Sequence, residues 1–454
     1  MRLMMGACVH GLRRLGVAAA AGVWALAALQ AQALEPDLDL PEPLTLSAAL
    51  AVADERAHTH HALMAVRARL ERARAELAQA RAANDARVTV EGEAAWLEPN
   101  PESRSQERYD LAAGVRYRRR LSDFGQRAAR ERAEAIGLTA EEWAYAHAQQ
   151  QYRIDVMAAF FEVLLADLAF SRDDEAMAIA FVRLDEARDR AELGELSDVE
   201  LLELEARYQR HRRARSQSQV EQRLTRAVLG EALALPQYRP TRLIAPELPE
   251  LGREPPPLPA LLDAALAHNP RVKAIEARLE SAQGQVEAAR AQTRPALDAQ
   301  AEAFRYRRDL SGRDDWRLGV VLSIPLYQGR RVEAAVAEAR SEVYAQRAAL
   351  ERARSELRGD VRALWEHLGV LQVAAEASRS QQDFRDLAFD ERRARYELEL
   401  ETDFGSAMVQ TTSARLEVAR VRYQRALTWA RLEAAVGGSE LMPLAQSSED
   451  RSIE

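Results

Sequence analysis

The chain has 454 residues, of which 47% are hydrophobic and 30% charged, and its formal net charge is -8. This composition excludes an intrinsically disordered chain, and the acidic balance argues against a nucleic-acid-binding protein. The only cysteine is Cys8, so the rest of the chain has neither a disulfide nor a thiolate metal site.

The N-terminus has the three parts of a secretory signal. Residues 1–33 contain Arg2, Arg13 and Arg14, then an apolar run over 15–29, then Ala-Gln-Ala. We expect a signal peptide over 1–33 and an exported chain that begins at Leu34. The alternative, a membrane anchor, needs a span of about 20 apolar residues, longer than this run.

The rest of the chain contains two similar halves. Residues 68–94 align without a gap on 277–303 and share the pattern "ARLE" at the start of each block. A period this long indicates a duplicated structural half. We therefore predict a first repeat over 34–233 and a second over 260–437. The segment 234–259 holds 8 of the 17 prolines, which predicts an extended connector.

Both halves predict the same elements in the same order. The first half has a helix-rich segment, two strands, a long helix, a tip turn and a shorter helix, over 46–85, 87–97, 108–121, 126–192, 193–198 and 199–232. The second half repeats this order over 258–294, 296–306, 315–327, 329–396, 396–405 and 404–436, before a C-terminal tail over 438–454. The fold class is mainly α with four strands per chain. Outside 1–33 no apolar run is long enough for a membrane-spanning helix.

The four predicted strands each have one apolar and one polar face. In a strand successive side chains point to opposite faces. The strongest apolar positions are Trp96, Tyr109, Leu111, Val115, Trp316, Leu318, Val320, Leu322 and Ile324. The charged positions on the opposite face are Glu91, Glu93, Arg116, Arg118, Arg120, Asp298, Glu302 and Arg317.

Two interpretations fit these strands. One is a sheet packed on the helices with its polar face in water. The other is a share of a transmembrane barrel, with the apolar face in lipid and the charged face lining a water-filled lumen. Since four strands cannot close a barrel, the second interpretation requires an oligomer, in which two chains supply eight strands and three supply twelve. The charged interior favours three.

The chain resembles the TolC-like outer membrane efflux protein family over about 44–437. The matching features are the duplicated layout, "LSDFGQR" at 121–127, "AELGELSDVELLELEAR" at 191–207 and "PLYQGRR" at 325–331. The resemblance implies a homotrimer with a twelve-stranded outer membrane barrel that continues into a periplasmic α-helical barrel. It implies a passive exit duct for drugs, metal ions or proteins that works with a periplasmic adaptor and an inner membrane pump. No enzyme activity and no cofactor are expected, and no catalytic motif is found.

The resemblance also implies that the adaptor docks on the tip turns. The first turn keeps the family pattern at Leu193, Gly194, Glu195 and Ser197. Glycine also suits a helix C-terminus and serine a helix N-cap, so a structural role explains the same residues. The second turn keeps Thr402 but departs from the pattern, because Glu399 stands where glycine is expected.

The second turn is acidic and is the candidate gate. Its constriction candidates are Tyr396, Glu397, Glu399, Glu401 and Asp403. Three copies that meet at a narrow end would form a ring of negative charge that selects cations. The alternative is an ordinary solvated turn.

Two histidines three residues apart, His58 and His61, make a weak metal site without a nearby carboxylate or thiolate, and no metal is expected. The rival class for the whole chain is a soluble periplasmic coiled-coil scaffold or adaptor.

Overall fold

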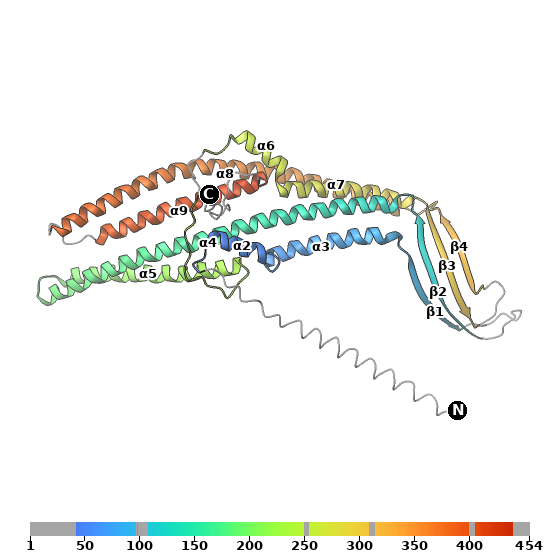
Figure 1. Ribbon diagram of the computed structural model, residues 1–454, viewed down its shortest axis with the longest axis horizontal. Helices are drawn as coiled ribbons and strands as arrows, with labels where there is room; N and C mark the ends of the chain where they lie inside the picture. The colour runs from blue at the N-terminus through green and yellow to red at the C-terminus, as the bar shows by residue number, and fades with distance from the viewer. Residues whose placement is uncertain are drawn as a thin grey trace, which may run out of the picture. The chain divides into compact units, whose positions relative to one another are not determined.

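The computed structural model describes residues 42–96, 98, 108–248, 254–307, 314–398 and 405–438. The predicted signal peptide and C-terminal tail lie outside these residues, apart from Gly438. The first half contains α2 (Leu46–Arg56), α3 (His61–Arg81), η2 (Ala82–Asn84), β1 (Arg87–Trp96), β2 (Tyr109–Ser122), α4 (Gln126–Glu192) and α5 (Asp198–Ala232). The second contains α6 (Leu258–His268), α7 (Pro270–Arg290), η3 (Ala291–Thr293), β3 (Ala296–Tyr306), β4 (Trp316–Ser323), α8 (Arg331–Glu397) and α9 (Gly405–Val436). The identical order in both halves agrees with a duplication (Figure 1).

The helices form a layer in which those of the second half lie beside those of the first (Figure 1). Among the described residues α4 packs along α5, α7, α3 and α9, while α8 packs along α9 and α7. Figure 1 shows α8, α9, α4 and α5 in this order toward the tip turns, so α8 and α5 are the outer helices there. At 1.5 Å per residue, α4 and α8 are each about 100 Å long.

Apolar stripes explain this packing. Phe160 and Phe161 of α4 are fully buried, and the Phe161 ring stacks on Tyr423 of α9 with 4.5 Å between the ring centroids. Leu357, Val361 and Leu368 of α8 face Trp429 and Leu432 of α9 within one apolar cluster. With Leu364, the apolar residues of α8 in this cluster are spaced 4, 3 and 4 residues apart, as in a coiled-coil seam. This spacing favours the pairing of the long helices.

The start of α4 is fixed by one carboxylate. Asp123 is buried, and its Oδ1 accepts from the Gly125 N–H at 3.0 Å while its Oδ2 accepts from the Arg127 N–H at 2.8 Å. Gly125 has φ +93°, a conformation that glycine adopts without steric cost. The carboxylate thus satisfies N–H groups that the first helical turn leaves unpaired, and the chain can turn sharply from β2 into α4.

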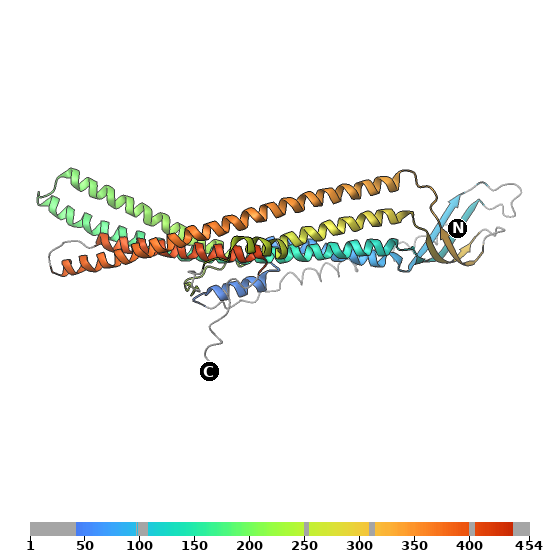
Figure 2. The ribbon, with the colours of Figure 1, turned by 90° about the horizontal axis from the view of Figure 1, so that it is seen from above.

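The four strands form one antiparallel sheet in the order β1-β2-β3-β4. Figures 1 and 2 both show the sheet beyond the ends of α3, α4 and α7. Its apolar face is not covered by helices, because Val90 remains 82% exposed and Leu318 74%. The sheet packed on its own helices, the first of the two interpretations, is therefore not what the chain forms.

One predicted boundary is wrong. The fourth strand was expected over 315–327, but β4 ends at Ser323, which pairs with Ala296, the first residue of β3. Beyond it there is no partner strand, and Pro325 cannot donate a hydrogen bond. Each predicted helix-rich segment consists of two helices, which are separated where His60 and Asn269 are extended, with ψ 127° and 124°. At Asn269 the following proline disfavours helical geometry.

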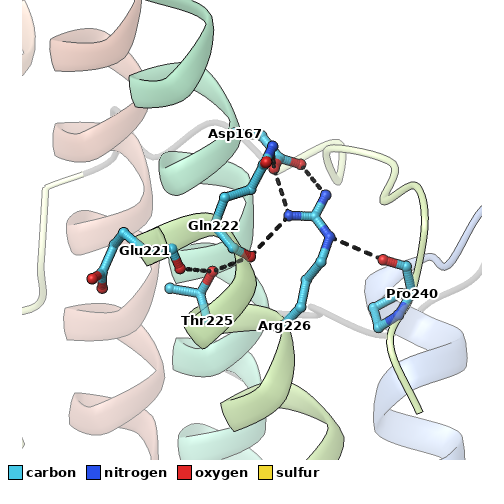
Figure 3. Close-up of polar contacts among 6 residues, drawn as sticks. All are labelled: Asp167, Glu221, Gln222, Thr225, Arg226 and Pro240. Carbon is cyan, nitrogen blue, oxygen red and sulfur yellow. Dashed lines mark hydrogen bonds and ion pairs between the residues drawn. The ribbon is translucent and has the colours of Figure 1, made fainter. Parts of the chain in front are cut away.

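The proline-rich connector is fastened to three helices. Arg226 of α5 donates through Nε to the Pro240 carbonyl at 3.0 Å, and its two terminal nitrogens reach the Asp167 carboxylate of α4 at 2.7 and 2.9 Å (Figure 3). Arg422 of α9 donates to the Pro246 carbonyl and Trp365 of α8 to the Pro256 carbonyl. A proline-rich segment can be held in this way because the proline carbonyl accepts hydrogen bonds, although proline has no N–H to donate.

No helix within the described part of the chain combines the length and the low charge needed to cross a membrane.

Candidate functional site

The strand register brings the predicted charged positions onto one face of the sheet. Arg116 lies opposite Thr89 of β1 and Glu302 of β3, and Arg120 lies opposite Asp298. Glu302 in turn lies opposite Arg317 of β4. Because a slip by one residue would move every side chain to the other face, this register is what gathers the charges.

Ion pairs link the strands across this charged face. Arg116 Nη1 lies 2.7 Å from Glu91 Oε1, and Arg116 Nε lies 3.4 Å from Glu302 Oε2. Arg120 Nε lies 3.0 Å from Oδ1 of Asp298, which is buried. The charges of β2 are therefore mostly matched by acids of its neighbours, and the face is a network of paired charges.

Two further members of the charged face, Gln300 and Phe304, were not singled out from the sequence. With the Gln300 amide oriented to satisfy its neighbours, its oxygen accepts from Arg118 Nη2 at 2.9 Å. The Phe304 ring lies 5.6 Å from the Arg116 guanidinium carbon and fills the space that Gly114 leaves open. A Cβ at position 114 would lie only 2.5 Å from that ring. The alternation of β3 placed Gln300 and Phe304 on this face, but neither is charged.

The opposite face is apolar and open. The register places residues of all four strands on it, and the predicted members found there are Trp96, Tyr109, Leu111, Val115, Trp316, Leu318, Val320 and Leu322, all of them exposed. Ile324 is also exposed but lies beyond the end of β4. The Trp96 and Tyr109 rings meet edge to face, with centroids 4.3 Å apart. Contiguous apolar surface of this kind marks a face that contacts lipid or another protein.

The remaining predicted charges occupy the edges of the sheet. Glu93 of β1 is exposed and lies opposite Ala112. Arg317 of β4 lies 4.0 Å from Asp314, and both side chains are exposed. These two residues therefore have room for interactions beyond the single chain.

The first tip turn has a complete set of caps. Gly194 has φ +76°, its N–H donates to the Ala191 carbonyl at 2.9 Å, and the Glu195 N–H donates to the Arg190 carbonyl at 2.9 Å. These two bonds form a Schellman motif at the end of α4. Leu193, just before the glycine, is 75% exposed.

Ser197 starts the next helix through a capping box. Its Oγ accepts from the Glu200 N–H at 3.3 Å, and Glu200 Oε2 accepts from the Ser197 N–H at 3.1 Å. The hydrogen bond from the Ser197 hydroxyl lowers the pKa of the Glu200 carboxyl below its ordinary value. Gly194 and Ser197 thus both stabilise the turn, and the Leu193 side chain remains exposed although its N–H donates to the Asp189 carbonyl.

The second tip turn is described only at its ends. Tyr396 and Glu397 are the last residues of α8, and Glu397 pairs with Arg393 at 3.0 Å. The other candidates, Glu399, Glu401, Thr402 and Asp403, lie outside the described residues.

The histidines near α3 are packed against an aromatic ring. The His60 ring lies 4.4 Å from the His61 ring and 4.5 Å from the Tyr152 ring. Burial lowers the pKa of the His60 imidazole and His61 lowers it further, while the Asp155 carboxylate raises it. Across the described residues no three His, Cys, Asp or Glu side chains gather as a metal site would require.

Comparison with known proteins gives a match to the second half of the chain. Residues 261–438 match the family model described as outer membrane efflux protein. This part of the chain is similar to outer membrane efflux protein domains. It contains α6 to α9 and the strands β3 and β4, almost in full. The resemblance stated from the sequence over about 44–437 is confirmed for the second half.

One relative and two solved structures extend this result. Protein CyaE of Bordetella pertussis (strain Tohama I) is 28% identical over 264 residues, which are 57% of this chain and 56% of that protein, so the similarity spans about half the length of the relative. The outer membrane channel CmeC of Campylobacter jejuni is similar with a TM-score of 0.68 and 15% identity, covering 87% of this chain and 85% of CmeC. The outer membrane protein VceC of Vibrio cholerae gives a TM-score of 0.65 and 17% identity, covering 86% and 96%. The chain therefore has the fold of these outer membrane proteins over nearly its whole described length.

Proposed function

We propose that the protein is the outer membrane channel-tunnel component of a tripartite efflux pump or a type I secretion system. In this role it is a passive exit duct that docks on a periplasmic adaptor served by an inner membrane pump. It lies in the outer membrane, and its long helices extend into the periplasm. The observation that carries the proposal is the two-faced sheet, which is apolar and exposed on one side and charged on the other.

The sheet supports a trimer for a physical reason. Open strand edges in hydrocarbon leave N–H and C=O groups unpaired at a cost of several kcal/mol each. β1 and β4 are such edges in a single chain. Three copies close twelve strands into one wall, with Arg116, Arg118 and Arg120 toward the lumen. The ion pairs of the charged face then line a wet interior.

The helices support the periplasmic part. Two coiled-coil hairpins per chain, α4–α5 and α8–α9, give six in a trimer, enough for a helical barrel around a continuous passage. Figure 2 shows the two hairpins diverging toward their turns. A duct of this kind needs no catalytic groups.

The tips supply the two specific functions. Leu193, Gly194, Glu195 and Ser197 form a capped, rigid turn on which an adaptor docks, with exposed Leu193 as the apolar contact. Thr402 is the corresponding docking residue of the second turn. Tyr396, Glu397, Glu399, Glu401 and Asp403 form the constriction, where negative charge favours cations.

Single-channel recording in planar lipid bilayers tests the proposal. The purified protein is expected to conduct with cation selectivity, and a Glu399→Gln, Glu401→Gln, Asp403→Asn chain to conduct with reduced selectivity. Unchanged selectivity in that chain contradicts the assigned constriction. Leu193→Asp is expected to conduct normally while no longer co-purifying with the adaptor.

The competing class is a soluble periplasmic scaffold. A channel stays with the outer membrane fraction after a high-salt wash and needs detergent for extraction. Release of the protein by salt alone, together with the absence of conductance, would contradict the channel.

A further inference from the structure

One arginine of β2 lies on the apolar face of the sheet. Successive side chains of a strand point to opposite faces, so Arg119 shares a face with Val115 and Tyr117, while Arg118 and Arg120 lie on the charged face. The Arg119 side chain is exposed. The proposed channel places this guanidinium on the side that meets lipid, where an isolated charge is costly.

The neighbours of Arg119 on this face are apolar. Across the β2–β3 ladder it lies opposite Ala299, and Ala299 in turn lies opposite Val320 of β4. Tyr117 precedes it on the same face of β2, and exposed Leu322 belongs to the next row toward the helices. A positive charge among such side chains costs free energy unless another group pairs with it.

Arg119 differs from the other arginines of the sheet in having no partner. Within the described part of the chain it forms neither a hydrogen bond nor an ion pair. Arg116 and Arg120 of the charged face both have acidic partners, and Arg305, at the opposite end of the apolar face, pairs with Asp315 at 2.9 Å. The Arg119 guanidinium is therefore available to a group from outside this part of the chain.

A second copy that continues the sheet would not supply the missing negative charge. Copies would join through the edge strands β1 and β4. As the structure describes these two strands, neither has an acid on the apolar face, where their residues are Val88, Val90, Gly92, Ala94, Trp96, Trp316, Leu318, Val320 and Leu322. In the proposed channel the bilayer is the remaining neighbour of this face.

The position of Arg119 along β2 fits the level of lipid phosphates. Tyr109 and Arg119 are ten residues apart, or about 33 Å along the strand. At the tilt of barrel strands this is about 25 Å across the bilayer, the height of the apolar band of outer membrane barrels. The Trp96 and Tyr109 rings lie at one border of this band. Arg119 then lies at the border next to the helices, because β2 ends at Ser122, just before α4.

We propose that Arg119 binds the phosphate of an anionic phospholipid in the leaflet next to the helices. The planar guanidinium can donate two parallel hydrogen bonds to phosphate oxygens, while the acyl chains cover Val320 and Leu322. A zwitterionic lipid has no net charge to balance the arginine, so an anionic headgroup is preferred. The inference rests on the proposed function, which places the sheet in a membrane, and it names the lipid class that the sheet selects there.

Quenching of a fluorophore by brominated lipids measures this preference. The label is attached to Val320→Cys, which lies in one row with Arg119 and Ala299, and the only native cysteine, Cys8, lies in the predicted signal peptide. The full chain is reconstituted in liposomes that mix phosphatidylglycerol and phosphatidylcholine, with either lipid brominated. The binding constant of phosphatidylglycerol relative to phosphatidylcholine at the label is expected to be about five.

Neutralisation of the arginine tests its role. Arg119→Gln is expected to lower the relative binding constant to about one, while brominated phosphatidylcholine still quenches the label and so shows that the sheet remains in the bilayer. Arg118→Gln is the matched control and is expected to keep the wild-type constant, since Arg118 lies on the opposite face and contacts Gln300. An equal loss in both variants, or no loss in Arg119→Gln, overturns the site.

Inorganic phosphate distinguishes a lipid headgroup from a free anion as the ligand. The preference of the wild type is expected to persist at millimolar phosphate. Its loss there, but not in chloride of the same ionic strength, shows a site for free phosphate and overturns the lipid. Equal quenching of the wild type by both brominated lipids overturns the lipid site and leaves the channel, whereas no quenching by either lipid overturns both.

Discussion

His60 lies at the start of α3, where a helix needs an acceptor that the imidazole does not supply. No side chain caps this helix, and Nδ1 of His60 is buried without a hydrogen-bond partner. Asn269 occupies the matching place in the second half, and its Oδ1 accepts from the Arg271 and Val272 N–H groups at 3.0 and 3.2 Å. The start of α7 is therefore capped by a side chain, whereas the equivalent start of α3 is not.

This difference predicts a pH effect. The pKa of His60 is lowered from 6.5 in the folded chain. At a pH between the folded and the unfolded pKa, His60 is protonated in the unfolded chain and neutral in the folded chain. The free energy of unfolding is therefore highest above pH 6.5 and falls as the pH drops toward the folded pKa. We expect His60→Asn to reduce this loss of stability, because Asn does not titrate. Asn can also cap α3, which stabilises the folded chain by about 1 kcal/mol.

Thermal unfolding midpoints recorded across this pH range measure the effect. His58→Asn is the control, since His58 is exposed in the same turn. His60→Asn is expected to gain over the wild type as the pH falls, whereas His58→Asn should follow the wild type. Parallel pH profiles for all three chains would contradict the account.

Among the elements, the connector depends most on a single side chain. Arg226 is 15% exposed and joins α5, α4 and the connector in one network with Asp167 and Pro240. Hydrogen bonds to charged groups contribute about 1.5–3 kcal/mol each. We expect Arg226→Ala to accelerate hydrogen exchange at 241–248 by roughly ten- to a hundredfold.

Arg215→Ala is the matched control for this prediction. Arg215 also joins α5 to α4, through Asp174 at 2.7 Å, but its pair is more exposed and does not reach the connector. Its removal is expected to leave exchange in the connector unchanged. Equal exchange in both variants would show that the connector is held by other contacts.

Much of the arrangement of elements could be predicted, because the apolar residues recur with the periods of strands and helices, 2 and 3.6 residues. The long helix α4 begins and ends where the periodicity indicates, and the alternation of β2 places Arg116 and Val115 on opposite faces. The end of β4 could not be predicted, since it depends on where β3 begins. Phe304 beside Arg116 depends on the absence of a side chain at Gly114, which only the register reveals.

At the scale of the whole molecule, the proposed channel requires that one face of the sheet contacts lipid and the other contacts water. The apolar positions of β4 stay exposed in the single chain, while Arg116 and Arg120 of β2 are paired with acids of the neighbouring strands. In a closed trimer the first set meets hydrocarbon and the second meets water. The proposed channel and its trimer both depend on this division.

Quenching of a fluorophore at two engineered cysteines in liposomes tests the division most directly. A label at Val320→Cys is expected to be quenched by lipids with brominated acyl chains and not by iodide. A label at Arg118→Cys is expected to show the reverse. If iodide quenches both labels equally and brominated lipid quenches neither, the sheet does not lie in the membrane and the proposed channel is wrong.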